Sequence, residues 1–392
     1  MADQPQTPKS DNSILNSIAF RGAAYQVLLG AGIALLGWYL YTNVNENLDR
    51  QNIATGWDFL EEPAGFGISE SIIAFDSSQT FARIFFAGVL NTLHVAFFGI
   101  ILATILGVTM GIARVSRNWL VAKLASTYVE ICRNVPVVLH VIFWSSIIRL
   151  LPHPRQAIEP FDGAFISNRG LMLPFPFDHS LYPWVGLALI VGIAGAVYFT
   201  RWARITREQT GKYIATFWPS IGIVLGVPLV IWLIGGAPLT WDFPALRGFN
   251  YQGGISLSPE YIALLIGITV YTAAFIAEIV RSGIESIHAG QIEAANALGL
   301  RRGFVMRYIT IPQALRVIVP PTASQFLSLT KNSSLGVLIG YPDLVNIGNT
   351  SLNQTGQAVE AIAIMMLVYL TISLTISGIM NLYNKLVAIK ER

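Results

Sequence analysis

Residue types that most often carry out chemistry are few in this chain of 392 residues. It has five histidines and one cysteine, Cys132, and none of them shows an HxxxH or CxxC spacing. The sequence therefore predicts no bound catalytic metal. The pair Gly211-Lys212 is followed by Tyr213 and lacks the upstream glycine of a phosphate-binding loop. We expect that this chain is not itself an ATP-hydrolysing enzyme.

Polar residues that could make functional contacts gather instead in two stretches. The first, QIEAANALGLRRGFVMRYITIPQA (291–314), is too polar to cross a membrane and too rich in helix-forming residues to be an irregular loop. Its pattern predicts a short alanine-lined helix over 291–298, ended by Gly299 and followed by a break at Pro312. Such a helix could lie in a cleft on another protein, where Glu293 would offer a charged contact. An ordinary solvated connector would have the same composition.

The second stretch lies in an otherwise apolar segment and carries a run of polar side chains. Pro320 and Pro321 are expected to kink or interrupt its start. Polar, irregular backbone at membrane depth is tolerated only where it is buried in protein or lines a cavity. The residues predicted to line a translocation pathway are Ser324, Ser328, Lys331, Asn332 and Ser333. Hydrogen bonding between helices is the alternative, and Lys331 could attract a carboxylate of either a substrate or a partner subunit.

One pair of opposite charges is expected to be structural. Glu130 and Arg133 lie three residues apart and share one face of a helix, which favours a structural ion pair over a transport role. A transporter driven by an ion gradient would need a carboxylate relay within the membrane. Apart from Glu130 and Glu278, the apolar segments offer little for such a relay, and no carboxylate or histidine constellation favours a membrane enzyme.

The elements that position these residues are predicted to be transmembrane helices. Hydrophobic residues make up 53% of the chain and charged residues only 12%, against roughly 25% charged residues in ordinary soluble domains. Because no period-two alternation appears, we expect an all-α polytopic membrane protein rather than a β-barrel. About eight segments approach the roughly 20 apolar residues that cross a bilayer: 23–41, 88–113, 121–151, 183–199, 214–234, 260–281, 314–340 and 359–383.

The distribution of charge predicts the orientation of these spans. Basic residues collect after the even-numbered spans, as in 201–212 and 281–307, whereas 46–76 is rich in Asp and Glu. The Pro-rich loops 152–182 and 235–259 hold few basic residues. By the positive-inside rule, both termini are expected in the cytoplasm.

Two glycine pairs in these spans fit close helix contact. They are GVTMG at 107–111 and GIVLG at 222–226. A GxxxG spacing lets two helix backbones approach, although it is a weak signal in a chain with 34 glycines. Ordinary helix packing is therefore the expected role of both.

The stretch 291–314 resembles the EAA signature of the permease subunits of ATP-binding-cassette importers. The sequence Glu293-Ala294-Ala295, three residues, Gly299, nine residues and Ile309-Thr310-Ile311-Pro312 matches its spacing, with Ile311 where the family usually has Leu. In that family the EAA region forms coupling helices that dock into a groove on a cytoplasmic ATPase. The docking residues that the resemblance implies are Glu293, Ala294, Ala295, Ala297, Leu298, Gly299, Ile309 and Pro312.

Other segments resemble the polar-amino-acid branch of these permeases. GVLNTLHVAFFGIILATILGVTMGIARVS (88–116) is similar to its first core helix, and YVEICRNVPVVLHVIFW (128–144) to its following ExxRxxP segment. LTKNSSLGVLIGYPDL (329–344) resembles the segment after its coupling region. His140 stands where Gln is common in the branch, so it is a further candidate for the translocation pathway and for substrate preference.

The whole layout resembles the general L-amino-acid permeases of Gram-negative bacteria. It implies a type I importer core of five helices, an extra N-terminal helix and two inserted helices. The expected parts are a cytoplasmic tail (1–22), a first transmembrane helix with a periplasmic segment (23–87), a permease domain (88–384) and a cytoplasmic C-terminal tail (385–392). Within the permease domain, the inserted helices are expected at about 183–235 and the EAA coupling loop at 281–313.

The resemblance implies import of L-amino acids across the bacterial inner membrane by alternating access. ATP and Mg²⁺ would be bound by a partner ATPase dimer, and this chain would hold no cofactor. Further expected partners are a second homologous permease, in a heterodimer or a homodimer, a periplasmic amino-acid-binding protein and membrane lipid, but not nucleic acid. An ion-gradient-driven secondary amino-acid transporter is the alternative.

Overall fold

The computed structural model describes residues 18–50, 55–176, 179–212 and 214–387, and it is mostly helical. Most of the expected N-terminal tail and residues 388–392 lie outside the described residues. The helices are α1 (Ile18–Arg50), α2 (Phe81–Arg114), α3 (Trp119–Asn134), α4 (Val137–Arg149), α5 (Tyr182–Thr210), α6 (Phe217–Ile234), α7 (Pro259–Glu285), α8 (Ala289–Ala297), α9 (Arg302–Val305), α10 (Ile311–Asn332), α11 (Leu344–Thr355) and α12 (Ala358–Val387). A π-helical segment (Met306–Thr310) joins α9 to α10, and the 3-10 helix η5 (Ser333–Ile339) continues α10.

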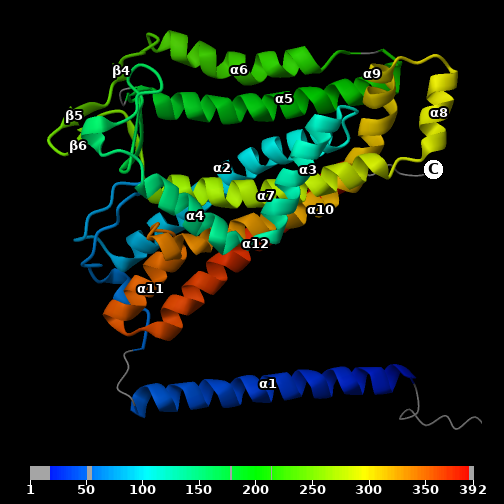
Figure 1. Ribbon diagram of the computed structural model, residues 1–392. Coiled ribbons are helices and arrows are strands. Elements are labelled where there is room, and N and C mark those ends of the chain that lie inside the picture. The colour runs from blue at the N-terminus through cyan, green and yellow to red at the C-terminus, as the bar shows by residue number, and fades with distance from the viewer. Residues whose placement is uncertain (1–17, 51–54, 177–178, 213, 388–392) are drawn as a thin grey trace, which may run out of the picture.

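Helix α7 is the centre of the packed core. More than half of its most apolar stretch is buried, and it packs against α2, α3, α4 and α10. In Figure 1 these helices form one layered group, with α8 at one end of it and strands β4 to β6 at the opposite end. Core side chains around α7 include Val95, Val141, Leu264, Ile268, Ile276, Val280 and Leu329. The burial of α7 on several sides explains why its sequence is apolar nearly all round.

Glycines let α2 and α7 approach each other closely. A Cβ atom added at Gly107 would lie 2.6 Å from Cβ of Ile276, and one at Gly111 would lie 2.6 Å from Cβ of Val280. Both distances are shorter than a van der Waals contact, so these positions hold glycine because a neighbouring helix occupies the space. The prediction of close contact at 107–111 is confirmed.

The same prediction is wrong for 222–226. No atom lies within 4 Å of a Cβ added at Gly222 or Gly226. Helices α5 and α6 pack on each other through Gly192 of α5, whose added Cβ would lie 3.1 Å from the backbone oxygen of Ile223. None of the described residues of α6 is buried, which is the exposure expected of an apolar helix that packs on one neighbour and faces lipid on its other sides.

The predicted span 121–151 is two helices. Helices α3 and α4 meet at an angle of 106°, because Pro136 has no backbone N–H and disfavours the helical conformation of the residue before it. Val135 is accordingly extended, with φ −93° and ψ 127°. In contrast, Pro320 and Pro321 lie inside a continuous α10, so the expected interruption there is not formed.

The predicted number of eight spans is not confirmed. Among the described residues, six helices are long and apolar enough to cross a membrane, or seven if α3 and α4 together form one span. Helix α10 is not among them, because its polar residues lower its mean hydropathy. Helix α1 lies apart from the other helices (Figure 1), and its side chains are almost all exposed.

The two loops predicted at 152–182 and 235–259 form short strands that pair with each other. Strands β1 (Phe165–Ser167), β2 (Gly170–Leu173) and β7 (Ile255–Leu257) make one antiparallel sheet in that order. Strand β3 (Phe175–Pro176) pairs with β4 (Trp241–Asp242), and β5 (Ala245–Arg247) with β6 (Asn250–Gln252). The α4–α5 and α6–α7 connections are thereby tied together, a pairing between distant segments that alternation in so few residues could not predict.

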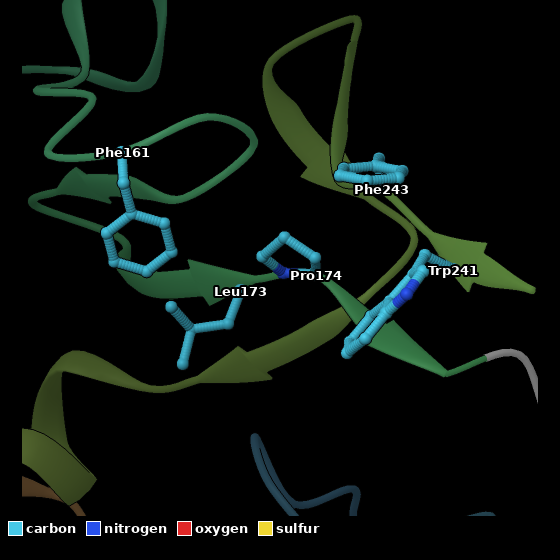
Figure 2. Close-up of a pocket in the computed structure, with 5 residues that line it drawn as sticks. All are labelled: Phe161, Leu173, Pro174, Trp241 and Phe243. Carbon is cyan, nitrogen blue, oxygen red and sulfur yellow. The ribbon is translucent and has the colours of Figure 1, made fainter. Parts of the chain in front are cut away.

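A pocket lies between these two connections. It has a volume of 370 Å³. Figure 2 shows its lining: Phe161, Leu173, Pro174, Trp241 and Phe243. All five side chains are apolar or aromatic, so the pocket offers shape and apolar surface but few hydrogen bonds.

Candidate docking and translocation sites

The predicted docking helix is α8, and its end is built by local sequence. Gly299 has φ +72°, the left-handed conformation that glycine adopts most readily. Its N–H donates to the oxygen of Asn296 (2.9 Å), and the N–H of Leu300 donates to the oxygen of Ala295 (3.2 Å). This pair of hydrogen bonds is a Schellman motif, as the sequence predicts for a helix ended by Gly299.

Side chains around α8 form an exposed surface, which we call the α8–α9 surface. Leu298 is 80% exposed and Tyr308 64% exposed, and Glu293, Ala294 and Ala297 are exposed as well. Phe304 stacks on Tyr308 with ring centroids 5.9 Å apart. Exposed apolar groups around one carboxylate are typical of a surface that another protein covers.

Ala295 points the other way, into this chain. It is only 3% exposed, so it anchors α8 to its own subunit and does not belong to the α8–α9 surface. Pro312 is exposed in the first turn of α10, and Ile309, which is partly exposed, accepts a hydrogen bond from Gln313 through its backbone oxygen (3.1 Å). The predicted docking residues are therefore near one another but differ in orientation.

Helix α8 is also linked to two core helices, α7 and α10. Gln313 at the start of α10 donates a hydrogen bond to Gln291 of α8 (2.5 Å). Only residues 286–288 separate α8 from the end of α7. Helices α7 and α10 pack closely below it, since a Cβ added at Gly283 would lie 2.3 Å from Cγ1 of Ile318. Helix α8 is therefore tied to two core helices.

Three of the predicted pathway residues share one exposed face of α10. Ser324, Ser328 and Lys331 are exposed and lie at helical spacings of four and three residues. Asn332 is partly buried. Ser333 is fully buried and donates to the backbone oxygen of Thr330 (2.7 Å), so the structure places it in the core, away from this polar face.

His140 lies at the bend between α3 and α4. Its Nε2 atom is 3.2 Å from the backbone oxygen of Cys132, and its side chain is 8% exposed. Together with Val135, Leu139 and Trp144 it lines a largely apolar pocket of 390 Å³ inside the bend. His140 thus contacts both sides of the bend, and its place in a translocation pathway stays a prediction.

The predicted ion pair between Glu130 and Arg133 is not formed. Glu130 is exposed, whereas Nη1 of Arg133 lies 3.2 Å from Oε2 of Glu278 on α7. Arg114 and Arg281 also contact Glu278. The correction has a simple cause, because α7 presents to Arg133 a carboxylate that two further arginines already surround. The i,i+3 spacing of Glu278 and Arg281 was the sequence signal for part of this cluster.

At the end of the molecule opposite α8, a second group of buried polar residues joins distant segments. The side-chain amide of Asn91 donates to the backbone oxygens of Glu70 and Pro342, both at 2.9 Å. Burial raises the pKa of Glu70, while a hydrogen bond from the Ser258 N–H (3.3 Å) opposes that rise. Burial also raises the pKa of Asp343, to about 7, although this carboxylate caps α11 by accepting from the N–H of Asn346 (3.0 Å).

Comparisons with known proteins agree with this architecture. Residues 212–389 match the family model described as binding-protein-dependent transport system inner membrane component. The general L-amino acid transport system permease protein AapQ of Rhizobium johnstonii is 44% identical over 95% of this chain and 94% of its own length. The putative amino-acid ABC transporter permease protein YhdX of Escherichia coli is 46% identical over the whole of both chains.

A third relative has a comparable match. The glutamate/glutamine/aspartate/asparagine transport system permease protein BztB of Rhodobacter capsulatus is 41% identical over all of this chain and 99% of its own length. Identity at this level along the full length, together with the apolar helices, shows the family. The chain belongs to the binding-protein-dependent transport system inner membrane components, the permease subunits of ATP-binding-cassette transporters.

Proposed function

We propose that this chain is the permease subunit of an importer that moves L-amino acids across the bacterial inner membrane at the expense of ATP. The three relatives above are named for amino-acid transport. The name of AapQ refers to L-amino acids in general, and that of BztB to glutamate, glutamine, aspartate and asparagine. The observation that carries the ATP-driven part of the proposal is the exposed α8–α9 surface, which includes Glu293 and Leu298.

The α8–α9 surface has the properties that docking on an ATPase requires. Leu298 and Tyr308 expose apolar area that water solvates poorly, and Glu293 provides a charge that a basic residue of the partner can pair with. The ATPase, present as a dimer, would bind ATP and Mg²⁺. In this proposal the permease chain itself holds no cofactor.

The direction of coupling follows from how α8 is held. A movement of the ATPase would displace α8. The short 286–288 connection would transmit this displacement to α7, and the Gln291–Gln313 hydrogen bond would transmit it to α10. Helix α10 carries the polar face of Ser324, Ser328 and Lys331. We assign to that face one wall of a pathway that opens alternately to each side of the membrane.

The remaining partners and the orientation belong to the same proposal. The α8 end and both termini would face the cytoplasm, and the strand end would face the periplasm and an amino-acid-binding protein. A second permease subunit, homologous or identical, would complete the pathway, since we assign one wall of it to the polar face of α10. Lipid would surround α6, none of whose described residues is buried.

A variant of Glu293 tests the proposal. Removing a buried interfacial charge costs about 2–5 kcal/mol, so Glu293→Ala should abolish ATP-driven uptake in reconstituted vesicles and reduce co-purification of the ATPase. Glu208→Ala is the matched control, since Glu208 is also an exposed glutamate at a helix end on the α8 side. Both variants should insert in the membrane in normal amounts.

The opposite result is equally clear. Wild-type uptake by Glu293→Ala would remove the proposed role of the α8–α9 surface. Uptake that persists without any ATPase, and that an ionophore abolishes, would replace the ATP-driven importer by the ion-gradient-driven transporter.

A further inference from the structure

One carboxylate joins three helices near the α8 end of the core. Oε2 of Glu278 on α7 contacts Nη1 of Arg114, at the end of α2, and lies 3.2 Å from Nη1 of Arg133, near the end of α3. Oε1 of Glu278 accepts a hydrogen bond from Arg281, one turn further along α7, at 2.5 Å. Arg281 in turn contacts Glu285 at 2.5 Å. We call these five residues the Glu278 cluster.

The cluster is asymmetric in burial and in charge. The side chain of Arg114 is 11% exposed and that of Glu278 is 23% exposed, whereas those of Arg133 and Glu285 are 40% and 52% exposed. Three arginines face two glutamates, so Glu278 separates guanidinium groups that would otherwise repel one another. Removing one partner of a largely buried ion pair leaves an uncompensated charge, which is strongly unfavourable.

Arg114 and Arg133 each make a further contact with a second helix. Nε of Arg114 lies 3.4 Å from the hydroxyl oxygen of Ser126 on α3, and the guanidinium of Arg133 lies 5.3 Å from the ring centroid of Phe275 on α7. The cluster thus sets the distance between the ends of α2, α3 and α7. The Arg114–Glu278 pair is largely shielded from water, whereas Arg133 reaches Glu278 from a more exposed position.

The cluster lies between the docking helix and the bend of α3 and α4. From Glu278, α7 continues for seven residues to Glu285, and α8 begins at Ala289. On the other side, Arg133 lies three residues before Pro136, where α3 turns into α4. A displacement of α8 that moves the end of α7 therefore pulls on the contact with Arg133 and so on the bend.

We propose that Glu278 is a positioning residue of the transport cycle, which latches the ends of α2 and α3 to α7 in this conformation. Release of Arg114 and Arg133 from Glu278 is the step by which a movement of α8 reaches the α3–α4 bend. Glu285 is not part of the latch, because its ion pair among the described residues is with Arg281 on its own helix. This inference rests on the proposed function, in which an ATPase moves α8.

The first test uses the complex of the full chain with its ATPase in lipid nanodiscs and vesicles. Glu278→Gln keeps the size of the side chain but removes the charge that holds Arg114 and Arg133. We expect ATP hydrolysis without binding protein to rise and uptake per ATP to fall by at least about fivefold, the lower range of ordinary coupling between sites. Glu278→Asp, which keeps the charge, should restore part of the coupling, and Glu285→Gln should behave as wild type.

A second measurement needs no ATPase. Spin labels at Thr127→Cys on α3 and Ser282→Cys on α7, both exposed positions, in a Cys132→Ala background report the separation of the two helices in the full chain. We expect one narrow distance in the otherwise unaltered chain and a broader, longer distribution with Glu278→Gln.

The outcomes separate the latch from the proposed function. If the spin-label distances and the uptake per ATP are the same in Glu278→Gln and in the unaltered protein, the latch is overturned. A loss of uptake that only follows a loss of assembled protein, with uptake per ATP unchanged, would overturn it as well. If the complex with Glu278 intact transports without using ATP, the proposed function fails, while the spin-label distances still decide whether Glu278 holds α3 to α7.

Discussion

The imidazole Nε2 of His140 lies 3.2 Å from the backbone oxygen of Cys132, across the bend that separates α3 from α4. In a continuous helix this oxygen would accept from the N–H of residue 136, but Pro136 has none. His140 supplies the missing donor, which requires the tautomer that carries its proton on Nε2. The side chain that replaces the backbone bond thus comes from the next helix.

His140→Leu is expected to destabilise the protein. It leaves the Cys132 oxygen without its donor in a buried position, at a cost of about 1–3 kcal/mol. His140→Gln is the matched variant, because its side-chain amide can still donate. The thermal unfolding midpoint of the purified chain should fall for His140→Leu and change less for His140→Gln. Equal midpoints for His140→Leu and unaltered proteins would contradict the capping role.

The bend illustrates what a sequence pattern could and could not predict. Segment 121–151 is apolar enough to span a membrane, so length and hydropathy predicted one helix. Whether a proline kinks a helix or splits it depends on what replaces the lost hydrogen bond. At Pro136 the donor is His140, eight residues from its acceptor, whereas Pro320 and Pro321 are accommodated inside α10. Packing in the folded chain decides whether the helix is kinked or split, so the residues next to the proline do not predict the outcome.

The Glu130–Arg133 prediction failed for a related reason. A spacing of three residues shows that two side chains can meet, but not whether either has a better partner. Arg133 turns to Glu278, which lies 145 positions later in the sequence. Patterns confined to one segment, such as the alanine-lined helix and its end at Gly299, were confirmed because their hydrogen bonds are local. The pairing of β2 with β7 and of β3 with β4 was missed because it joins segments that are far apart in the sequence.

The two GxxxG pairs provide a direct test of packing. Gly111→Val would place atoms 2.6 Å from Cβ of Val280 and 2.8 Å from the oxygen of Ala277. Overpacking of this kind typically costs about 1–3 kcal/mol. Gly226→Val is the matched control, since its added Cβ has no neighbour within 4 Å. We expect the thermal unfolding midpoint to fall for Gly111→Val and to stay near that of the unaltered protein for Gly226→Val. A reversed order would contradict the α2–α7 contact.

The ionisation of Asp343 is expected to make stability depend on pH. Burial raises the pKa of this carboxyl from 3.8 to about 7 in the folded chain. Well below pH 3.8 the group is protonated in both states. Between pH 3.8 and about 7 the unfolded state ionises while the folded state stays protonated, so the folded state loses stability as pH rises to about 7. A shift of this size corresponds to roughly 4 kcal/mol. Asp343→Asn, which can still accept from the N–H of Asn346, should therefore stabilise the protein at pH 8 and have little effect at pH 4.

Two comparisons make the Asp343 prediction specific. The quantity to measure is the difference in thermal unfolding midpoint between variant and unaltered protein at each pH, which cancels the titration of other groups. Asp343→Ala loses the helix cap as well, at a cost of about 1 kcal/mol that is independent of pH. A difference between Asp343→Asn and Asp343 proteins that stays constant from pH 4 to pH 8 would show that the carboxyl does not titrate as expected.

The polar face of α10 can be tested by the access of water to it. A thiol reacts as its thiolate, which forms in water but not in lipid or in a packed core. In a Cys132→Ala background, Ser328→Cys should therefore react with a charged, membrane-impermeant thiol reagent. Leu329→Cys, the next residue and fully buried, should not. Reaction at Ser328→Cys that slows when transported amino acid is added would place this face in the pathway. No reaction at Ser328→Cys in any state of the complex would mean that lipid or a partner subunit covers it, and the hydroxyls of α10 would then serve packing between helices.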